Sequence, residues 1–201
     1  VQPRDEEREI WTGYRPGPEG ARERFGADAA YTFDELDEKL PLLIQGVHKL
    51  HYAFGVSAAH DRKLRAAIAK AAREARKNGA DTPEVFYAPS YLLHELRLLK
   101  SEDELVLMRE AARITAVGFS RAMAMAEPGL PEYRIEAAME HAWRELGGTG
   151  RAFNTIVGGG AHATVLHYVT NDDVLDDGDL VLVDAGAEVG WYSADVTRTF
   201  P

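Results

Sequence analysis

Apolar residues recur every three or four positions in four stretches of the chain, which is the spacing of one helix face. These stretches predict helices over residues 32–45, 61–78, 101–125 and 131–146. Capping-box patterns mark two of the starts, Thr32 with Glu35 and Ser101 with Glu104, and Asp61 is the expected cap of another helix. Pro131 opens the last of these stretches, so we expect four helices, each with a recognisable start.

Runs rich in β-branched, aromatic and aliphatic residues predict strands. They cover residues 8–14, 47–54, 84–88, 153–157, 164–168, 180–184 and 191–200. Strands and helices alternate up to residue 88, which is typical of an α/β domain, whereas strands follow one another after residue 152, as in an α+β domain. We place the crossing between domains at residues 94–99 and expect two domains, 1–97 and 98–201.

The last two predicted strands are joined by a turn at Glu188-Val189-Gly190. A hairpin that closes symmetrically about Val189-Gly190 places Asp184 directly opposite Asp195. Directly opposed residues point to the same face with Cβ atoms about 4.5–5.5 Å apart, a spacing at which like charges destabilise a sheet. The pair therefore needs something to hold it together.

Few basic groups are available to neutralise this aspartate pair. Residues 152–201 contain eight acidic residues and one base, Arg198, whose position in its strand directs it to the face away from Asp195. A local salt bridge is therefore disfavoured. A shared proton or a divalent metal ion remains.

Two other interpretations of the pair stay open. Both aspartates could be solvated surface carboxylates, but Asp184 shares a face with Leu180 and Leu182, which predicts a position at the edge of a core. Asp184-Ala185-Gly186 could also be an aspartic-protease loop, in which two carboxylates share one proton. That loop lacks the expected hydroxyl residue after the aspartate, and the chain has no second copy of it.

Composition removes several classes of function. The 33 acidic residues exceed the 23 basic ones, for a formal net charge of −10, and no basic cluster is present, so nucleic acid is excluded as a partner. No apolar run approaches the roughly 20 residues of a membrane helix, and the first residues are charged where a signal peptide is apolar. With no cysteine, a metal must take oxygen and imidazole ligands, and the chain suits a cytoplasmic location.

Four stretches together resemble one known group of enzymes. The hairpin with Asp184 and Asp195 is similar to that of the pita-bread metallopeptidases, and within them the chain most resembles the Xaa-Pro aminopeptidase (aminopeptidase P) family from about Trp11 to Pro201. The supporting stretches are His94-Glu95-Leu96-Arg97-Leu98-Leu99-Lys100-Ser101, Phe153-Asn154-Thr155-Ile156-Val157-Gly158-Gly159-Gly160 and Val165-Leu166-His167-Tyr168. The resemblance implies an α/β N-terminal domain remnant followed by an α+β first half of a pita-bread (creatinase/aminopeptidase) catalytic domain, in a chain expected to be an internal fragment.

The resemblance also implies a chemistry. Family members bind two divalent metal ions, commonly Mn²⁺, through two Asp, one His and two Glu, and hydrolyse the N-terminal Xaa-Pro bond of peptides by a metal-bridged hydroxide. Asp184 and Asp195 match the two aspartates, and His167 matches a histidine that contacts substrate near the scissile bond. The remaining His and Glu ligands have no counterpart in these residues, so we expect the fragment to be inactive alone. Thr197, two residues beyond Asp195 and on its face, is placed to hydrogen-bond that carboxylate.

Peptides with proline in the second position are the implied partners, and a homo-oligomer is expected for the full-length protein. Two alternatives stay open. Prolidase has the same fold and metals but cleaves only dipeptides, and a pita-bread domain without metal can serve as a peptide-binding module. Retention of both aspartates disfavours the second alternative.

Overall fold

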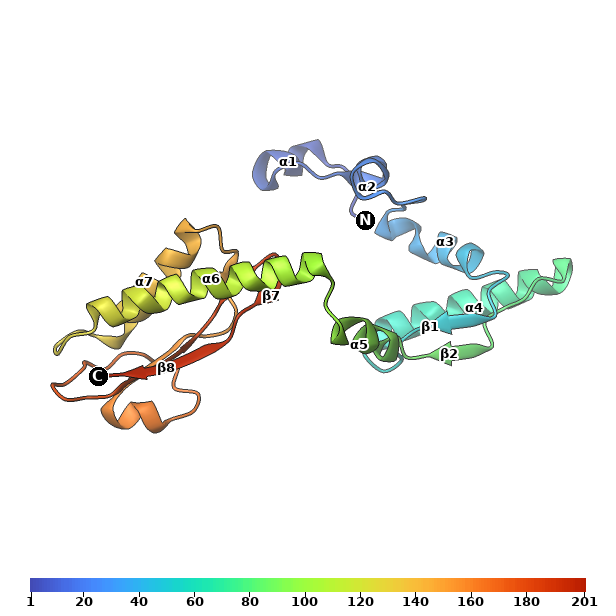
Figure 1. Cartoon of the computed structure of the whole chain (residues 1–201). Coiled ribbons are helices and arrows are strands. Elements are labelled where there is room, and N and C mark those ends of the chain that lie inside the picture. Colours follow the sequence, from blue (N-terminus) through green and yellow to red (C-terminus); the bar gives the residue numbers. More distant parts are fainter. The chain divides into compact units, whose positions relative to one another are not determined.

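A computed structural model describes all residues, 1–201, and divides them into two compact units, Val1–Leu98 and Leu99–Pro201 (Figure 1). Each unit has a core of its own. The first is built from helices and two short strands, and the second from two long helices packed on antiparallel strands. No helix in either unit is long and apolar enough to cross a membrane.

The first unit contains one parallel strand pair with a helical crossover. Strands β1 (Lys49–His51) and β2 (Val85–Tyr87) lie side by side, and α4 (Ala58–Asn78) connects them. The unit's other helices are α1 (Glu6–Thr12), α2 (Gly17–Phe25), the 3₁₀ turn η1 (Phe33–Glu35), α3 (Leu36–Leu43) and α5 (Ser90–Leu98). Its small core gathers Ile44, Ala67 and Ala71. The alternating pattern of an α/β domain is therefore confirmed here.

The predicted strand over residues 8–14 is wrong, because α1 occupies most of it. The Asp5 side chain accepts a hydrogen bond from the Arg8 amide, and three acidic residues fill the first turn of the helix, where they interact favourably with its dipole. Ile10 and Trp11 are 81% and 85% exposed, so these apolar residues meet no partner strand. Local capping decided the conformation of this segment.

The cap of α4 also differs from the prediction. Ser57, not Asp61, is the N-cap residue, and its hydroxyl accepts from the His60 amide. The Asp61 carboxylate accepts instead from the Tyr52 hydroxyl and the Gly55 amide at 2.8 and 3.0 Å, and these bonds lower its pKa. Asp61 thus ties the loop after β1 to the first turn of the helix.

Helices α6 (Glu102–Met125) and α7 (Glu132–Glu145) form one layer of the second unit. The capping box of Ser101 and Glu104 is present at the start of α6, as predicted, and Pro131 is the N-cap residue of α7. The two helices pack against each other and against the strands (Figure 1). The buried residues between them and the strands are Ile114, Phe119, Ala122, Ile135, Met139, Trp143, Val157, Leu175, Val181, Val183, Ala185 and Ala187.

The strands form two small antiparallel sheets. One has the order β4 (Ile156–Gly159), β5 (Val181–Ala185), β8 (Val196–Phe200), and the other β3 (Gly150–Arg151), β6 (Ala187–Val189), β7 (Tyr192–Ser193). One long hairpin supplies strands to both sheets, and its ladder is interrupted at Gly186. A Cβ atom on Gly186 would collide with the Ala194 carbonyl, so glycine permits the close approach at this crossing.

The register of the hairpin differs by two residues from the prediction. Asp184 pairs with Thr197, not with Asp195. The two-residue turn is Gly190-Trp191, with φ values of 55° and 71°, and positive φ at both positions is the signature of a type I′ turn. Because the shift is an even number of residues, Asp184 and Asp195 still belong to the same face.

Two more strand predictions need correction. Strand β4 begins at Ile156 and not at residue 153, and residues 164–168 form no strand. A 3₁₀ helix, η2 (Gly160–Thr164), and a turn replace the predicted strand. Side-chain hydrogen bonds, described below, hold this loop where a sheet ladder was expected.

Candidate active site

A pocket of about 440 Å³ brings together three of the four sequence-predicted site residues. It is lined by Phe153, Asn154, Ile156, His167, Val169, Asp184 and Asp195. Strand β5 contributes Asp184, the chain just before β8 contributes Asp195, and the loop after η2 contributes His167. Segments separated in sequence therefore converge on one hollow.

Asp184 lies on the outer face of β5, which corrects the expectation that its face is apolar and packed. Val181, Val183 and Ala185 alternate with it and are buried in the core, whereas Asp184 is half-buried and Leu180 is 57% exposed. The carboxylate therefore has a hydrophobic layer behind it and access to solvent in front. Such a position suits a group that binds something from outside.

Thr197 hydrogen-bonds a different aspartate from the one predicted. Its hydroxyl donates to the Asp184 carboxylate at 2.8 Å, because the observed register places the two residues directly opposite each other. The predicted bond from Thr197 to Asp195 is absent. Thr197 thus fixes one oxygen of Asp184 and leaves the other oxygen free to act as a ligand.

Asp195 is exposed and makes no hydrogen bond or ion pair with another residue. It lies where the ladder is interrupted, one residue after Ala194 and close to the backbone of Gly186. Neither Asp195 nor Asp184 forms an ion pair with a basic side chain. The two acidic side chains consequently share one pocket with no positive charge of the protein to balance them.

His167 lies in the turn after η2 and is exposed at the edge of this pocket. Its ring makes no hydrogen bond, ion pair or ring contact, and the preceding Leu166 is 87% exposed. An imidazole with both nitrogens available can donate to, or accept from, a molecule that enters the pocket.

The donor set of the pocket fits part of a site for a hard divalent cation. Two carboxylates offer oxygen ligands, which Mg²⁺ and Mn²⁺ prefer, and Thr197 holds one of them in place. No group of three or more His, Asp or Glu side chains converges anywhere in the chain as a complete metal site would require. Asp184 and Asp195 could therefore hold a metal only with further ligands from elsewhere.

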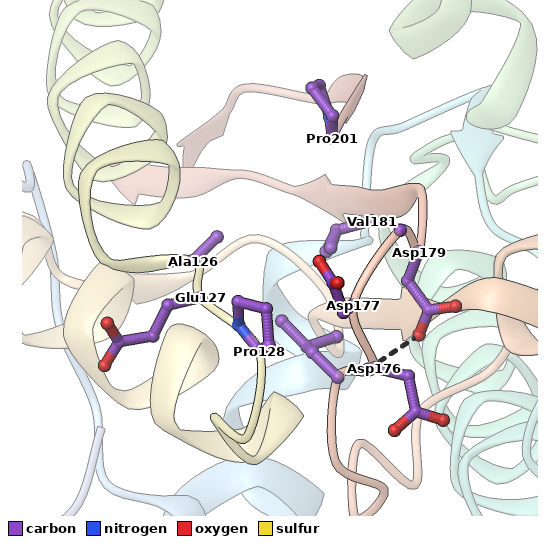
Figure 2. Close-up of a pocket in the computed structure, with 10 residues that line it drawn as sticks. Ala126, Glu127, Pro128, Asp176, Asp177, Asp179, Val181 and Pro201 are labelled. Atoms are coloured by element: carbon purple, nitrogen blue, oxygen red, sulfur yellow. Dashed lines mark hydrogen bonds between the residues drawn. The ribbon is translucent and has the colours of Figure 1, made fainter.

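A second pocket, of about 290 Å³, lies at the other end of β5 and is lined by several acidic residues. Figure 2 shows Asp176, Asp177 and Asp179 around it, with the Asp176 amide donating to the Asp179 carboxylate at 3.0 Å. That carboxylate closes a local turn, and the three acidic side chains do not converge. This pocket is separate from the one that contains His167.

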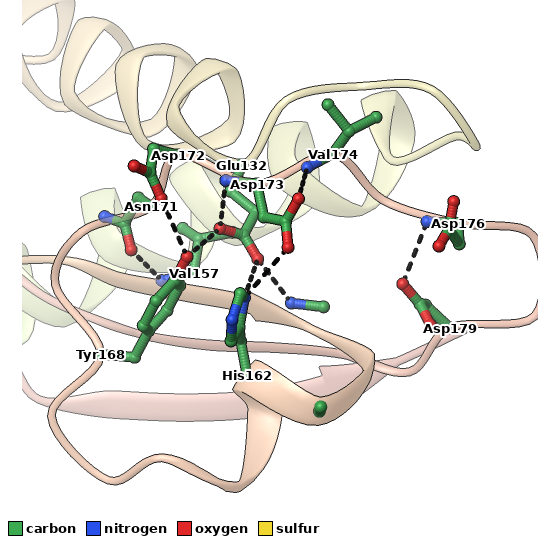
Figure 3. A network of polar contacts seen from close by, with 12 residues as sticks. Glu132, Val157, His162, Tyr168, Asn171, Asp172, Asp173, Val174, Asp176 and Asp179 are labelled. Carbon is green, nitrogen blue, oxygen red and sulfur yellow. Dashed lines mark hydrogen bonds and ion pairs between the residues drawn. The ribbon is translucent and has the colours of Figure 1, made fainter.

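Sequence reasoning missed the residues that hold the His167 loop. Glu132, the first residue of α7, is 1% exposed and accepts a hydrogen bond from the Tyr168 hydroxyl (Figure 3). Asn171, which is also buried, bonds to strand β4. An isolated Glu at a helix start is ordinary in a sequence, so no local signal identifies its partner 36 residues away.

Comparisons with known proteins agree with this geometry. Residues 106–201 match the model of metallopeptidase family M24, and residues 1–52 match that of the aminopeptidase P N-terminal domain. The second part of the chain is therefore similar to metallopeptidase family M24, and a segment similar to the aminopeptidase P N-terminal domain lies ahead of it. The predicted fold class, an α/β N-terminal domain followed by the first part of a pita-bread domain, is confirmed. A match to a metallopeptidase family implies divalent metal ions.

Individual relatives are proline-specific aminopeptidases by name. The chain is 39% identical over 199 residues to the Xaa-Pro aminopeptidase of Escherichia coli, covering 98% of this chain and 45% of that protein. The solved aminopeptidase PepP of Pseudomonas aeruginosa superposes with a TM-score of 0.92 at 43% identity, covering 100% of this chain and 45% of the other. The Zn-substituted E. coli aminopeptidase P in complex with product gives 0.92 at 38% identity, with the same coverage. The chain thus spans about 45% of the length of these relatives.

Proposed function

We propose that this chain contributes metal-binding and substrate-binding residues to an Xaa-Pro aminopeptidase, a hydrolase that removes the N-terminal residue of a peptide when proline follows it. The observation that carries the proposal is the pocket shared by Asp184, Asp195 and His167 within the M24 region. The names of the relatives support the substrate class.

Asp184 and Asp195 are proposed as ligands of two divalent ions, with Mn²⁺ as the expected metal. Bound in this way, such ions would act as Lewis acids toward the scissile carbonyl and would lower the pKa of a bound water. Thr197 keeps the Asp184 carboxylate oriented toward the pocket. The remaining ligands, a His and two Glu in the family pattern, would come from residues beyond these 201.

His167 is proposed as the catalytic residue of this chain that contacts the substrate. At the pocket edge, with no partner inside the protein, its imidazole can hydrogen-bond a peptide oxygen and stabilise charge that develops there. The apolar side chains beside it, Phe153, Ile156 and Val169, would exclude water from one side of the bound peptide.

An Xaa-Pro bond suits metal chemistry for a physical reason. It is a tertiary amide without an N–H group, so a peptidase that anchors that N–H cannot use it. Metal polarisation of the carbonyl does not depend on the missing hydrogen. The substrates proposed are therefore peptides longer than two residues with proline second, and a homo-oligomeric cytoplasmic enzyme remains our prediction.

Peptide assays on the complete gene product with Mn²⁺ supplied test the proposal. We expect cleavage of an Xaa-Pro-containing tripeptide. Cleavage of an Xaa-Pro dipeptide alone would identify a prolidase, and cleavage of neither substrate would favour a binding module. His167→Ala should lower the rate by about 10²–10³-fold, the usual loss for one transition-state hydrogen bond. His60→Ala, at an exposed position on α4 of the other unit, is the matched control and should leave the rate unchanged.

The 201-residue chain by itself gives a second test. Two carboxylates are too few ligands for a tight site, because metal affinity rises with ligand number and rigidity. We expect weak Mn²⁺ binding and no peptidase activity. Calorimetry that detected two tightly bound ions would contradict the proposed division of ligands.

A further inference from the structure

Glu132 is a buried carboxylate that gathers three hydrogen-bond donors. One oxygen accepts from the Gly159 amide at 2.9 Å, and the other accepts from the Tyr168 hydroxyl at 2.8 Å and the Asp173 amide at 3.1 Å (Figure 3). The Glu132 amide in turn donates to the Asp173 carbonyl at 2.9 Å. As the first residue of α7, Glu132 also lies at the positive end of the helix dipole. The buried charge is therefore well compensated.

Tyr168 is the member of this network that belongs to the His167 loop. Its ring stacks on His162 with centroids 4.3 Å apart, and His162 Nδ1 lies 3.6 Å from a Glu132 oxygen. Burial and the bond to Glu132 raise the pKa of the Tyr168 phenol to about 12. The phenol therefore stays protonated and donates to the carboxylate throughout the neutral range.

His167 directly precedes this anchored tyrosine in the chain. The imidazole has no partner of its own, and Leu166 on its other side extends into solvent. Tyr168, one residue further, is the nearest position along the chain whose side chain is tied to the body of the unit. Because the turn is held at Tyr168, the residue immediately before it has little freedom to move.

Asn171 fixes the far end of the same loop. It is 1% exposed and has a φ of 49°, an uncommon value for a residue other than glycine. Its side chain accepts from the Val157 amide and donates to the Thr155 carbonyl and the Glu136 carboxylate. The loop that carries His167 is thus pinned to both α7 and β4.

We propose that the hydrogen bond between Tyr168 and Glu132 is a positioning device that holds His167 at the edge of the Asp184 and Asp195 pocket for peptide hydrolysis. This inference rests on the proposed function. Glu132 and Tyr168 act through His167 and touch no substrate themselves. The Tyr168 phenol thereby connects buried Glu132, at the start of α7, to the exposed turn that contains His167.

A double-mutant cycle on the complete gene product tests the coupling. Tyr168→Phe removes one oxygen and should lower kcat/KM by about 10- to 100-fold through misplacement of His167. In the double variant with His167→Ala, the loss should be no larger than that of His167→Ala alone. A purely structural role of Tyr168 would make the two losses multiply, which would overturn the proposal.

The matched control is Tyr133→Phe, the same change at an exposed residue of α7 next to Glu132. It should alter neither kcat nor KM. Glu132→Gln places an amide NH₂ against groups that are themselves donors, so it should reproduce the loss seen in Tyr168→Phe. An unchanged kcat/KM in Glu132→Gln would contradict the role assigned to the carboxylate.

Side-chain NMR of histidine-labelled protein separates this inference from the proposed function. Comparison with the spectrum of His167→Ala identifies the His167 signal. The His167 side chain should be less mobile in the wild type than in Tyr168→Phe, because Tyr168 holds the adjacent backbone, whatever reaction the protein catalyses. If the wild type cleaves no Xaa-Pro peptide but this loss of order is seen, the function fails and the positioning stands. If the wild type is active and the ring is equally ordered in both, the positioning fails alone.

Discussion

The β4–β5–β8 sheet has one face packed against α6 and α7 and another that is open, and the two faces differ in what their residues do. On the packed face, Val181, Val183 and Ala185 are at most 3% exposed and belong to one continuous core. On the open face, Asp184 is half-buried and Asp195 is exposed. Residues on one face of β5 therefore stabilise the core, whereas Asp184 on the other face is accessible to a ligand.

This contrast shows how a carboxylate pair with no cation is tolerated. Like charges on neighbouring strands oppose folding by about 0.2–1 kcal/mol, whereas a fully buried aliphatic side chain contributes about 1.5–3 kcal/mol. The stabilisation from the core behind the sheet is therefore larger than the repulsion between the carboxylates in front of it. Substitutions on the two faces should consequently change different measured quantities.

The largest effect is expected for the carboxylates. Asp184→Ala or Asp195→Ala in the complete gene product should abolish Xaa-Pro hydrolysis, because either change removes a proposed metal ligand. Asp195→Ala should change the free energy of unfolding without metal by no more than about 0.5 kcal/mol, since the residue is exposed and has no partner. Peptide assays and urea unfolding measure the two effects. Retained activity in either variant would contradict the ligand assignment.

In the core behind the packed face, Met139→Ala on α7 should act in the opposite way. Met139 is 0% exposed in the core, so its truncation should lower the free energy of unfolding by about 2–5 kcal/mol. Activity per folded molecule should be unchanged. Met123→Ala on α6, where the side chain is 48% exposed, is the control and should have a much smaller effect on stability. Equal losses for the two methionines would show that the core boundary is misplaced.

A smaller effect is expected for the hydroxyl that orients Asp184. Thr197→Val keeps the shape of the side chain and removes the 2.8 Å bond, so metal affinity should fall by about 10- to 100-fold. Thr199→Val, two residues along the same strand and without a side-chain partner, is the matched control. Metal titration of both variants measures the difference. Identical affinities would mean that Thr197 does not orient the carboxylate.

The smallest effect is a titration at high pH. Because the folded pKa of Tyr168, about 12, exceeds the ordinary phenol value of 10.0, its contribution to stability is fully present below about pH 10 and is lost as pH rises through 12. A difference spectrum between wild type and Tyr168→Phe at 295 nm should titrate near this value. The core face contains no such group, so the loop should loosen before the core does. A midpoint near 10 would show that Tyr168 is not held by Glu132.

The sequence by itself determined the features that depend on near neighbours. The capping box of Ser101 and Glu104 joins residues three apart, and it was predicted correctly. The period of two in a strand also places Asp184 and Asp195 on the same face, even though the predicted register was wrong by two residues. The resemblance to aminopeptidase P rested on the aspartate hairpin and three other short stretches, and the family models agree with it.

Only the tertiary structure decided which residues meet across the fold. The register depended on a type I′ turn that places Trp191 at positive φ. Tryptophan is not among the residues that signal such a turn in a sequence. The loop of His167 was mistaken for a strand because its fixed conformation comes from Glu132, 36 residues before Tyr168. A contact of that separation forms only when the chain between has folded, since loop closure must be offset by packing elsewhere. Local patterns therefore predicted residues that line the pocket, and long-range packing determined how they are held.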